Sequence, residues 1–518
     1  MAIKTIQLSL FFHKINALCE EMGAHLRHAA FSPDIRDRLD YSCAMFDNCG
    51  QLCAQAAHIP VHLGSMAFVM EGIVDKFDWR SGDIVIFNDP FMGGTHLPDV
   101  TLVMPVFSKG ECVGFVANRA HHADIDSEEP GSMPLSSRLK QEGIVISPQY
   151  LGRANQIDNS LYEKVFFEVQ QKDNTYADIS AQHGANLHGV NRLQVLIDEL
   201  EVSQFQQLID QVFEYSRAMA VSQLKRIPNG DYAAIDFMDD DGLGAVDIPI
   251  KVNVSVDNGC IQVDFSGTAN QVTGNINCPK AVTAAAVMYV FRCLMSDDMP
   301  ASKGLFDPIS ITTVPGSLVD ANYPAAVAAG NVETSSRIVD VLFAALAQAC
   351  PNEIPAASQG TMNNIAMGVH GENAWSYYET IGGGAGATAS CNGMDAVQTH
   401  MTNTQNTPIE VLEMNYPLRV RRYEIRRGSG GRGQKGGGCG MIREFEFLQP
   451  ARVTILSERR THAAYGLKGG GPGKPGQNFL NNQLIKGKVC LTVKSGDCVR
   501  IKTPGGGAFG LAELVNKI

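Results

Sequence analysis

The stretch DIVIFNDPFMGGTHLPDVTLVMPVF, residues 83–107, decides how the N-terminal part of this chain folds. Its first five residues, 83–87, have the β-branched and aromatic composition of a buried strand, and an Asn-Asp-Pro sequence ends that strand. The loop at 93–99 then combines two glycines, which allow close backbone approach, with a proline that fixes the exit. His96 and Asp99 place an imidazole and a carboxylate three positions apart in this loop.

Two strand-like runs, 100–107 and 112–118, follow around a short turn that contains Gly110. Runs of this kind on either side of a glycine-containing turn predict a β-hairpin. If the turn is centred near Gly110, Asp99 and His121 are equally distant from it and pair with each other. Directly opposed residues lie about 4.5 to 5.5 Å apart at Cα. The hairpin therefore predicts that Asp99 and His121 are neighbours, with His96 close by in the loop.

His96, Asp99 and His121 form a set of two imidazoles and one carboxylate. Three such ligands leave coordination positions open for water or substrate, as in catalytic rather than structural metal sites. The alternative is that His96 and Asp99 cap a turn and His121 is a core histidine. Three carboxylates in this part of the chain are candidate partners of the ligands or candidate general bases: Asp40, Asp89 and Asp124.

The composition limits the classes of protein that this chain can belong to. A length of 518 residues predicts two to four packed units, and 44% hydrophobic with 19% charged residues is typical of a globular protein. A net charge of -12 argues against nucleic-acid binding. The arginine-rich stretch at 419–432 is explained by an exposed strand edge with a turn. No apolar run reaches the roughly 18 residues of a membrane span, so no membrane association is expected.

The cysteines and the N-terminus predict a cytoplasmic protein. The 13 cysteines are odd in number, contain no CxxC pair and lie among apolar neighbours, as at Cys293 and Cys350. This pattern favours buried, reduced thiols over a disulfide framework or a zinc ribbon. Residues 1–12 lack a signal-peptide cleavage site and continue into helical spacing at 15–22, which predicts the first helix of the mature chain.

The order of strand-like, helical and glycine-rich segments along the sequence predicts a mixed α/β (α+β), multi-domain fold. Strand-like segments at 248–256 and 261–265 precede apolar helical segments at 281–294 and 338–349, and short glycine-punctuated strands fill the last hundred residues. We predict an N-terminal metal-site domain, a central α/β domain and a Gly-rich, β-rich C-terminal domain, with these bounds: 1–230, 231–415 and 416–518.

The glycine runs at 428–438 and 469–474 do not form a phosphate-binding P-loop. That loop needs GxxxxGK followed by Ser or Thr, because the hydroxyl binds magnesium. Lys474 is followed by Pro475, and Lys435 is followed by another glycine. Tight turns and close backbone packing are therefore the favoured interpretation of both runs.

Several long motifs resemble those of the hydantoinase B/5-oxoprolinase family, and they extend over essentially the whole chain. They are FSPDIRDRLDYSC (31–43), AHIPVHLGSM (57–66), NDPFMGGTHLPD (88–99), RAHHAD (119–124), PGSM (130–133), GNVETSSR (330–337), GSGG (428–431) and TPGGG (503–507). One departure concerns Asp126 and Ser127, where many relatives have two glycines, so the shape of that loop and the substrate can differ.

The resemblance implies a B-type subunit that works with an A-type, ATP-binding subunit of actin-like fold, in a hetero-oligomer such as A2B2. Members of the family open cyclic amides such as hydantoins, 5-oxoproline or lactams. In related acetone carboxylases the matching residues look like manganese ligands, which implies that His96, Asp99 and His121 bind a divalent transition metal, Mn or Zn. The partner would bind ATP and Mg.

The implied reaction is hydrolysis of an amide that the partner has phosphorylated on oxygen, which makes the amide a better electrophile. Candidate catalytic residues are Asp40, His122 and Asp124, with Asp40 or His122 preferred as the base. His122 can instead point to the opposite face of its strand from His121, because neighbours in a strand alternate. Two alternatives stay open: an ATP-dependent ketone carboxylase of the acetone or acetophenone type, and an iron oxygenase with a two-His, one-carboxylate site.

Overall fold

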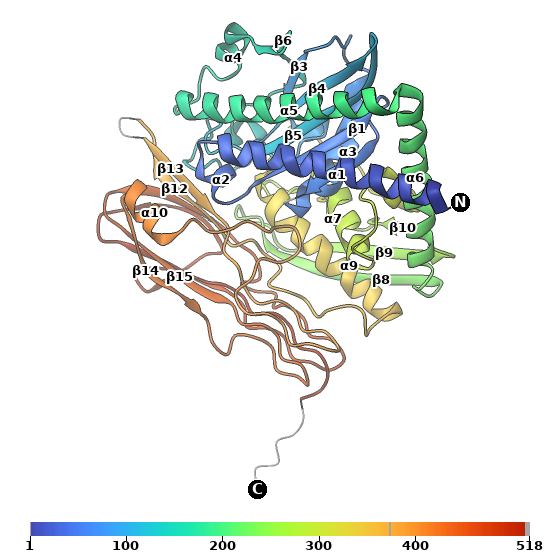
Figure 1. Ribbon diagram of the computed structural model, residues 1–518. Coiled ribbons are helices and arrows are strands. Elements are labelled where there is room, and N and C mark those ends of the chain that lie inside the picture. The colour runs from blue at the N-terminus through green and yellow to red at the C-terminus, as the bar shows by residue number, and fades with distance from the viewer. Residues whose placement is uncertain (1, 58, 372–373, 513–518) are drawn as a thin grey trace.

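The structure is a computed structural model that describes residues 2–57, 59–371 and 374–512. Within these residues the strands form four sheets, and helices cover the two sheets that come first in the chain (Figure 1). The predicted mixed α/β, multi-domain fold is confirmed. No helix among the described residues is both long and apolar enough to cross a lipid bilayer.

The first sheet has seven antiparallel strands in the order β2-β1-β5-β4-β3-β6-β7. Its strands are β1 (Tyr41–Asp47), β2 (Leu52–Ala57), β3 (Ile84–Phe87), β4 (Asp99–Ser108), β5 (Glu111–His121), β6 (Gln149–Arg153) and β7 (Gln156–Ile157). The accompanying helices are α1 (Ala2–Ala29), α2 (Pro33–Arg36), α3 (Pro60–Val74), α4 (Asn159–Val165), α5 (Lys172–Leu200) and α6 (Val202–Leu224), with short 3-10 turns at Pro90–Met92 and Leu139–Glu142.

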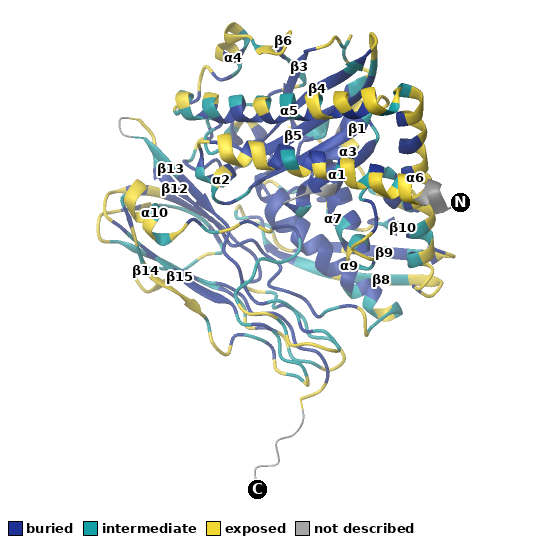
Figure 2. Cartoon of the chain, viewed as in Figure 1, coloured by how far each residue is buried: buried dark blue, intermediate teal, exposed yellow. Residues whose placement is uncertain are grey.

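Alternation along β4 explains why this sheet is buried on both faces. Val100 and Leu102 point into the core shared with α1 and α5, whereas Val103 points into the core shared with α3. Successive side chains of a strand point to opposite faces, so a run of apolar residues suits a strand covered on both sides. Figure 2 shows the result: the strands are buried, and the exposed residues of α1, α5 and α6 lie on the outer faces of these helices.

The central part of the chain is a four-stranded sheet in the order β11-β10-β9-β8, with helices packed on it. The elements are β8 (Gly230–Asp240), β9 (Val246–Asp257), β10 (Cys260–Asp264), β11 (Ile309–Thr312), α7 (Lys280–Cys293), α8 (Lys303–Phe306), a π-helical turn (Gly330–Thr334) and α9 (Ser335–Ala349). α3 packs against α7, so the central layer closes over the first sheet. The strands and helices predicted here from periodicity are confirmed.

The C-terminal part is built from two further sheets that share one apolar core. One contains β12 (Asn364–Val369), β13 (Trp375–Glu379), β16 (Ala451–Leu456) and β19 (Lys488–Val493). The other contains β14 (Leu418–Ile425), β15 (Met441–Phe447), β17 (Gln477–Leu480), β18 (Gln483–Ile485) and β20 (Cys498–Lys502), and α10 (Ile409–Asn415) leads into β14. The boundary predicted at 415 does not separate independent sheets, because β12 pairs with β16 across it.

β14 also explains the arginine-rich stretch at 419–432. This strand lies at one edge of its sheet and most of its residues are exposed, as predicted for an exposed strand edge.

The prediction that Cys293 and Cys350 are buried is wrong. Cys293 is exposed and Cys350 is only partly buried, because they lie at and just beyond the C-terminal ends of α7 and α9. Cys19, Cys43 and Cys278 are buried, and all cysteines are free thiols.

The glycine runs pack backbone against backbone, as predicted. Gly431 N donates to Gly506 O (2.9 Å) and Gly506 N donates to Gly438 O (3.0 Å), so distant loops cross at hydrogen-bonding distance. A Cβ atom on Gly506 would lie 2.1 Å from Ala385 O. Only residues without a side chain allow this approach.

Gly506→Ala is therefore expected to destabilise the C-terminal sheets, at a cost of roughly 1–3 kcal/mol for overpacking. Gly436→Ala is the matched control, because the nearest atom to a Cβ there is Gly431 O at 3.8 Å. Thermal unfolding should show a lower midpoint for the first variant and an unchanged midpoint for the second. Equal midpoints for the two variants would contradict the close-packing explanation.

Candidate metal centre

Three strands of the first sheet end at one point. β1 starts after Asp40, β5 ends at His121, and β4 starts at Asp99, so these three ends of neighbouring strands lie side by side. The register pairs Asp99 with His121, as the hairpin argument predicted; a bulge between Val106 and Phe107 shifts the ladder by one residue relative to the turn, so that Asp99 faces His121 rather than Ala120. His121 N donates to Asp40 O (3.0 Å), so the neighbouring strand is fixed to the same place.

The loop between β3 and β4 is held in place by buried polar groups. Asn88 Nδ2 donates to Leu97 O (2.7 Å), and its Oδ1 accepts from Ile146 N (2.7 Å). A Cβ atom on Gly94 would lie 2.4 Å from Asn88 O, so this glycine is required where the loop folds back on itself. The buried guanidinium of Arg119 donates to Gly93 O (3.2 Å). The loop therefore presents its histidine from a fixed backbone.

Asp99 is the centre of a buried cluster of imidazoles. Its Oδ1 lies 3.2 Å from His96 Nε2 and 3.3 Å from His121 Nδ1. Its Oδ2 accepts from the Thr95 hydroxyl and lies 3.3 Å from His62 Nε2. The structure thus brings together the three predicted ligands, His96, Asp99 and His121.

These residues fit a divalent metal ion. Ligand atoms of His96, Asp99 and His121 all lie within 4.8 Å of one another, and the three residues are buried. Separations of 3.2 and 3.3 Å are long for charge-assisted hydrogen bonds, which are about 2.7–2.9 Å. They match the roughly 3.0–3.4 Å expected between two atoms that each bind one metal ion at about 2.1 Å.

The second nitrogen of each imidazole faces away from Asp99. His96 Nδ1 and His121 Nε2 are buried and have no hydrogen-bond partner within the described residues. They are not the nitrogens that lie 3.2 and 3.3 Å from Asp99 Oδ1, so the case for the ion rests on the donor set and its spacing. A donor set of two imidazoles and one carboxylate suits Zn or Mn and leaves positions free for other ligands.

The charge of the cluster also suits a cation. Burial opposes ionisation of Asp99, but the neighbouring His96 and His62 hold its pKa well below the usual range. Burial likewise opposes protonation of His121, but the hydrogen bond to Asp99 and the charge of Asp40 raise its pKa. Asp99 is therefore ionised at neutral pH and offers a full negative charge to an ion.

A small cavity of about 20 Å³ lies beside the cluster, and Asp40 lines it. Asp40 is buried, although it belongs to a charged stretch of sequence. The ring of Tyr378 stacks on His121 with centroids 5.1 Å apart, and Asn331 closes another side. A group of threonine hydroxyls completes the wall: Thr380, Thr402 and Thr404. The cavity accepts a water molecule or the reacting atoms of a ligand, but not a whole ring.

His62 is the residue of this cluster to which the sequence had assigned no role. It lies in the first turn of α3, where its Nδ1 is 3.0 Å from Ser42 Oγ and its Nε2 faces Asp99. A signal was present, because His62 belongs to the AHIPVHLGSM motif and is one of five histidines between residues 58 and 122. Its spacing from Asp99 could not be deduced, since a whole helix and a strand separate the two residues. His58, the other histidine of that motif, lies outside the described residues.

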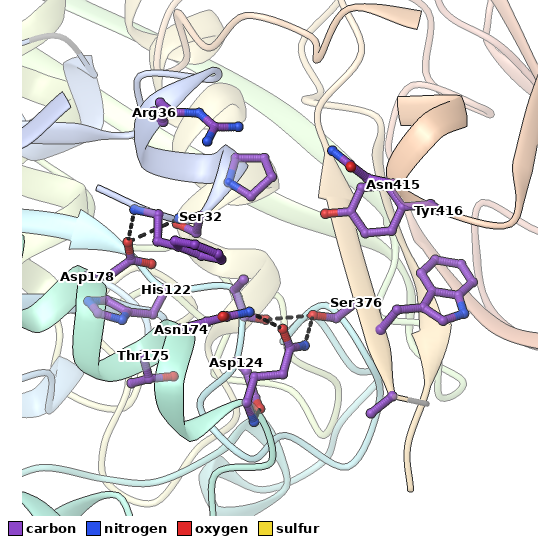
Figure 3. Close-up of a pocket in the computed structure, with 16 residues that line it drawn as sticks. Ser32, Arg36, His122, Asp124, Asn174, Thr175, Asp178, Ser376, Asn415 and Tyr416 are labelled. Atoms are coloured by element: carbon purple, nitrogen blue, oxygen red, sulfur yellow. Dashed lines mark hydrogen bonds between the residues drawn. The ribbon is translucent and has the colours of Figure 1, made fainter. Parts of the chain in front are cut away.

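His122 and Asp124 do not join the cluster. His122 points to the α5 side of the sheet, where its Nε2 meets Gln182 Oε1 (2.9 Å), and burial lowers its pKa. Asp124 accepts backbone N–H groups from Asp126 (2.9 Å), Gln170 (3.0 Å) and Gln171 (2.9 Å). Both residues line a separate cavity, which Figure 3 shows. A catalytic role for either residue stays a prediction.

Two further sequence expectations concern loops near the site. Asp89 caps the short 3-10 turn that follows β3, with its carboxylate accepting from Phe91 N (3.0 Å). Asp126, the position at which we expected a departure from the family motif, has a φ of 57°. This is the left-handed region that glycine favours and that Asp tolerates better than most residues. The loop therefore keeps a glycine-like backbone although its sequence departs from the motif.

Comparison with known families identifies relatives over nearly the whole chain. The family model described as Hydantoinase B/oxoprolinase matches residues 4–512. The chain is 38% identical to 5-oxoprolinase 1 of Arabidopsis thaliana over 98% of its own length, but it spans only 42% of that protein. It is 31% identical to the B subunit of a putative D-/L-hydantoinase from a Pseudomonas species, covering 98% of this chain and 90% of that one.

A solved structure has the same fold. The ATP-dependent caprolactamase from Pseudomonas jessenii superposes with a TM-score of 0.89 at 26% identity, covering 98% of this chain and 91% of that one. The similarity extends over all the sheets described above.

If His96, Asp99 and His121 hold a metal, the purified chain should contain about one divalent transition metal ion per molecule by elemental analysis. His121→Ala should lose most of it, because an ion loses one of only three protein ligands. His13→Ala is the matched control, since His13 is an exposed histidine on α1. Full metal content in His121→Ala would rule out this assignment.

Proposed function

This chain belongs to the hydantoinase B/oxoprolinase family, and we propose that it is the metal-bearing B-type component of an ATP-dependent amidohydrolase that opens a cyclic amide. The substrate class is a hydantoin, 5-oxoproline or a lactam. The observation that carries the proposal is the buried cluster of His96, Asp99 and His121, a catalytic type of ligand set with open positions. The caprolactamase neighbour, whose name states that it is ATP-dependent, supports the reaction class.

An A-type partner supplies the nucleotide site in this proposal. The glycine runs of the present chain lack the lysine and hydroxyl arrangement of a P-loop and are occupied by backbone packing. The chain spans 42% of the Arabidopsis relative, whereas the Pseudomonas relative of similar length is named as one subunit of a hydantoinase. The A-type partner would bind ATP and Mg and form a hetero-oligomer such as A2B2. The free thiols of the chain suit the cytoplasm.

Phosphorylation addresses the poor reactivity of an amide. The partner would transfer the γ-phosphoryl group of ATP to the amide oxygen and give an O-phosphorylated imidate. Water then adds to the imidate carbon, the ring C–N bond breaks as nitrogen takes up protons, and a second water releases phosphate from the acyl phosphate. A divalent ion held by His96, Asp99 and His121 would supply Lewis acidity, which polarises the substrate oxygen and acidifies water.

Asp40 is the best-placed general base of this chain. It is a buried carboxylate that lines the cavity beside His121, and its backbone is fixed to β5. Its role is to accept a proton from the attacking water. Tyr378 holds the imidazole of His121 by stacking, and Asn331 with the threonine wall offers uncharged hydrogen-bonding groups to the reacting amide. His122, on the other side of the sheet, is a less suitable base for this cavity.

Asp40→Asn should therefore reduce turnover by about 10²-fold or more, the range expected for loss of a general base. Assembly with the partner and metal content should be unchanged, because Asn keeps the size of the side chain. Metal analysis and turnover are measured on the same sample. Wild-type turnover would remove Asp40 from the mechanism, and loss of the metal would show that Asp40 is a ligand rather than a base.

The proposal that the A-type partner, and not this chain, binds ATP is tested with the chain alone and with the pair. The isolated chain should show no ATP binding in calorimetry and no ATP hydrolysis. The pair should hydrolyse ATP in the presence of one member of a panel of hydantoins, 5-oxoproline, lactams and ketones. Stoichiometric ATP binding by the isolated chain would contradict the proposal. Bicarbonate-dependent turnover of a ketone would show that the complex is a carboxylase instead.

A further inference from the structure

A second cavity, of about 320 Å³, lies on the α5 side of the first sheet, opposite the metal cluster. Its walls come from the segment before α2, the end of β5, the first turns of α5, β13 and the end of α10 (Figure 3). A volume of this size suits a small molecule. The mechanism proposed above does not use this cavity.

Asp178 is the charged residue of this cavity that has a carboxylate oxygen available to bind a ligand. Its side chain is buried, and one carboxylate oxygen, Oδ1, accepts Phe31 N (2.7 Å) and Ser32 N (3.1 Å). The other oxygen makes no hydrogen bond within the described residues. Asp178 therefore keeps a fixed orientation through Oδ1 and presents the rest of its charge to the cavity. A buried carboxylate of this kind needs a cationic or hydrogen-bonding partner.

Two other acceptors lie on the same wall. Ser32 Oγ is buried and has no partner among the described residues. The second acceptor is His122, and the other bonds of Gln182 fix the direction of the hydrogen bond between the two residues. Gln182 Nε2 donates to Val100 O (3.0 Å) and to Asn118 Oδ1 (2.9 Å), so Gln182 Oε1 is the atom that faces His122 Nε2. His122 Nε2 must then donate, which leaves the lone pair of the neutral ring on Nδ1.

The remaining charged groups of the cavity are already paired. Asp124 uses both carboxylate oxygens on backbone N–H groups, and Arg36 is bound to Asp37 at 2.9 and 3.1 Å. Trp375 and Tyr416 form an aromatic wall with ring centroids 5.6 Å apart. Free acceptors, a carboxylate with one oxygen that makes no hydrogen bond, and an aromatic wall are the chemistry that binds an ammonium ion, which has three N–H donors.

We propose that this cavity binds the ammonium group of a small amine, with Asp178 as its counter-ion and Ser32 and His122 as additional acceptors. The ligand class follows if the proposed function is correct, on which this part of the inference rests. A cyclic amide has no ammonium group, whereas opening 5-oxoproline or a lactam releases an amino group; opening a hydantoin gives a ureido group instead, so the inference applies to the first two classes. The cavity therefore distinguishes the ring-opened amino acid from the substrate and is a product site.

Binding is tested on the full chain with 6-aminohexanoate and glutamate, the ring-opened forms of caprolactam and 5-oxoproline. Hexanoate and glutarate are the matched compounds without an ammonium group. The chain has two tryptophans, and Trp375 lines the cavity, so its fluorescence reports occupation. The amino compounds should change the emission in a saturable way, and the matched acids should not. Trp375→Phe should remove the optical change while calorimetry still detects binding.

Asp178→Asn should weaken binding by about tenfold or more, because it removes the charge. Asparagine retains an oxygen to accept the N–H groups of Phe31 and Ser32, so the local fold is preserved. Asp158→Asn is the matched control, since it makes the same charge change at the N-cap of α4 and should leave binding unchanged.

Three outcomes would overturn the inference: equal binding of hexanoate and 6-aminohexanoate, no binding of either amino compound, or unchanged binding in Asp178→Asn. Hydrolysis by the complex is assayed separately with caprolactam and 5-oxoproline, the cyclic forms of these amino compounds. Ammonium binding without hydrolysis of any cyclic amide would mean that the proposed function fails and the ammonium site stands. Hydrolysis without ammonium binding would mean the reverse.

Discussion

The pairing of Asp99 with His121 in the β4–β5 hairpin is the constraint on which the rest of the site depends. A slip of one residue would turn His121 to the other face and bring His122 beside Asp99, because side chains alternate along a strand. The register is fixed on both sides, by β3 pairing with β4 and by β1 pairing with β5. The same register places two different sites on opposite faces of the sheet. Residues on the α3 side build the cluster of His96, Asp99 and His121 that we propose holds a metal, and residues on the α5 side build an acceptor-lined cavity.

Buried ion pairs attach the distant parts of the chain that close the metal cavity. Arg337, which follows the π-helical turn, lies 3.1 Å from Glu458, and Glu458 also binds Lys488. Removing one member of such a buried pair typically costs about 3–5 kcal/mol, because the other charge is left without a partner. The π-helical turn itself carries Asn331 into the cavity, and such turns are frequent at functional sites. The central and C-terminal sheets therefore complete a site whose carboxylates and histidines belong to the first sheet, its loops and the first turn of α3.

Local patterns were sufficient for the strands and for bringing His96, Asp99 and His121 together, since each depends on residues close in sequence, although the pairing of Asp99 with His121 also requires the bulge near Phe107. They were insufficient for contacts between residues far apart in sequence, because tertiary packing determines those contacts. His62 meets Asp99 only because α3 folds back on the sheet, and β12 pairs with β16 across a boundary that composition suggested near 415. The orientation of His122 follows from alternation, but its hydrogen bond to Gln182 depends on where α5 lies. Asp178, which we place at the centre of the ammonium site, has no motif to mark it.

The central claim is that His96, Asp99 and His121 hold one divalent metal ion. Anomalous diffraction from crystals of the chain, recorded on both sides of the Mn and Zn absorption edges, tests it most directly. The account predicts a single strong anomalous peak about 2 Å from the imidazole nitrogens and the Asp99 carboxylate, present above one edge and absent below it. An ion-free cluster in crystals grown with Mn or Zn, or a peak bound elsewhere in the chain, would contradict it.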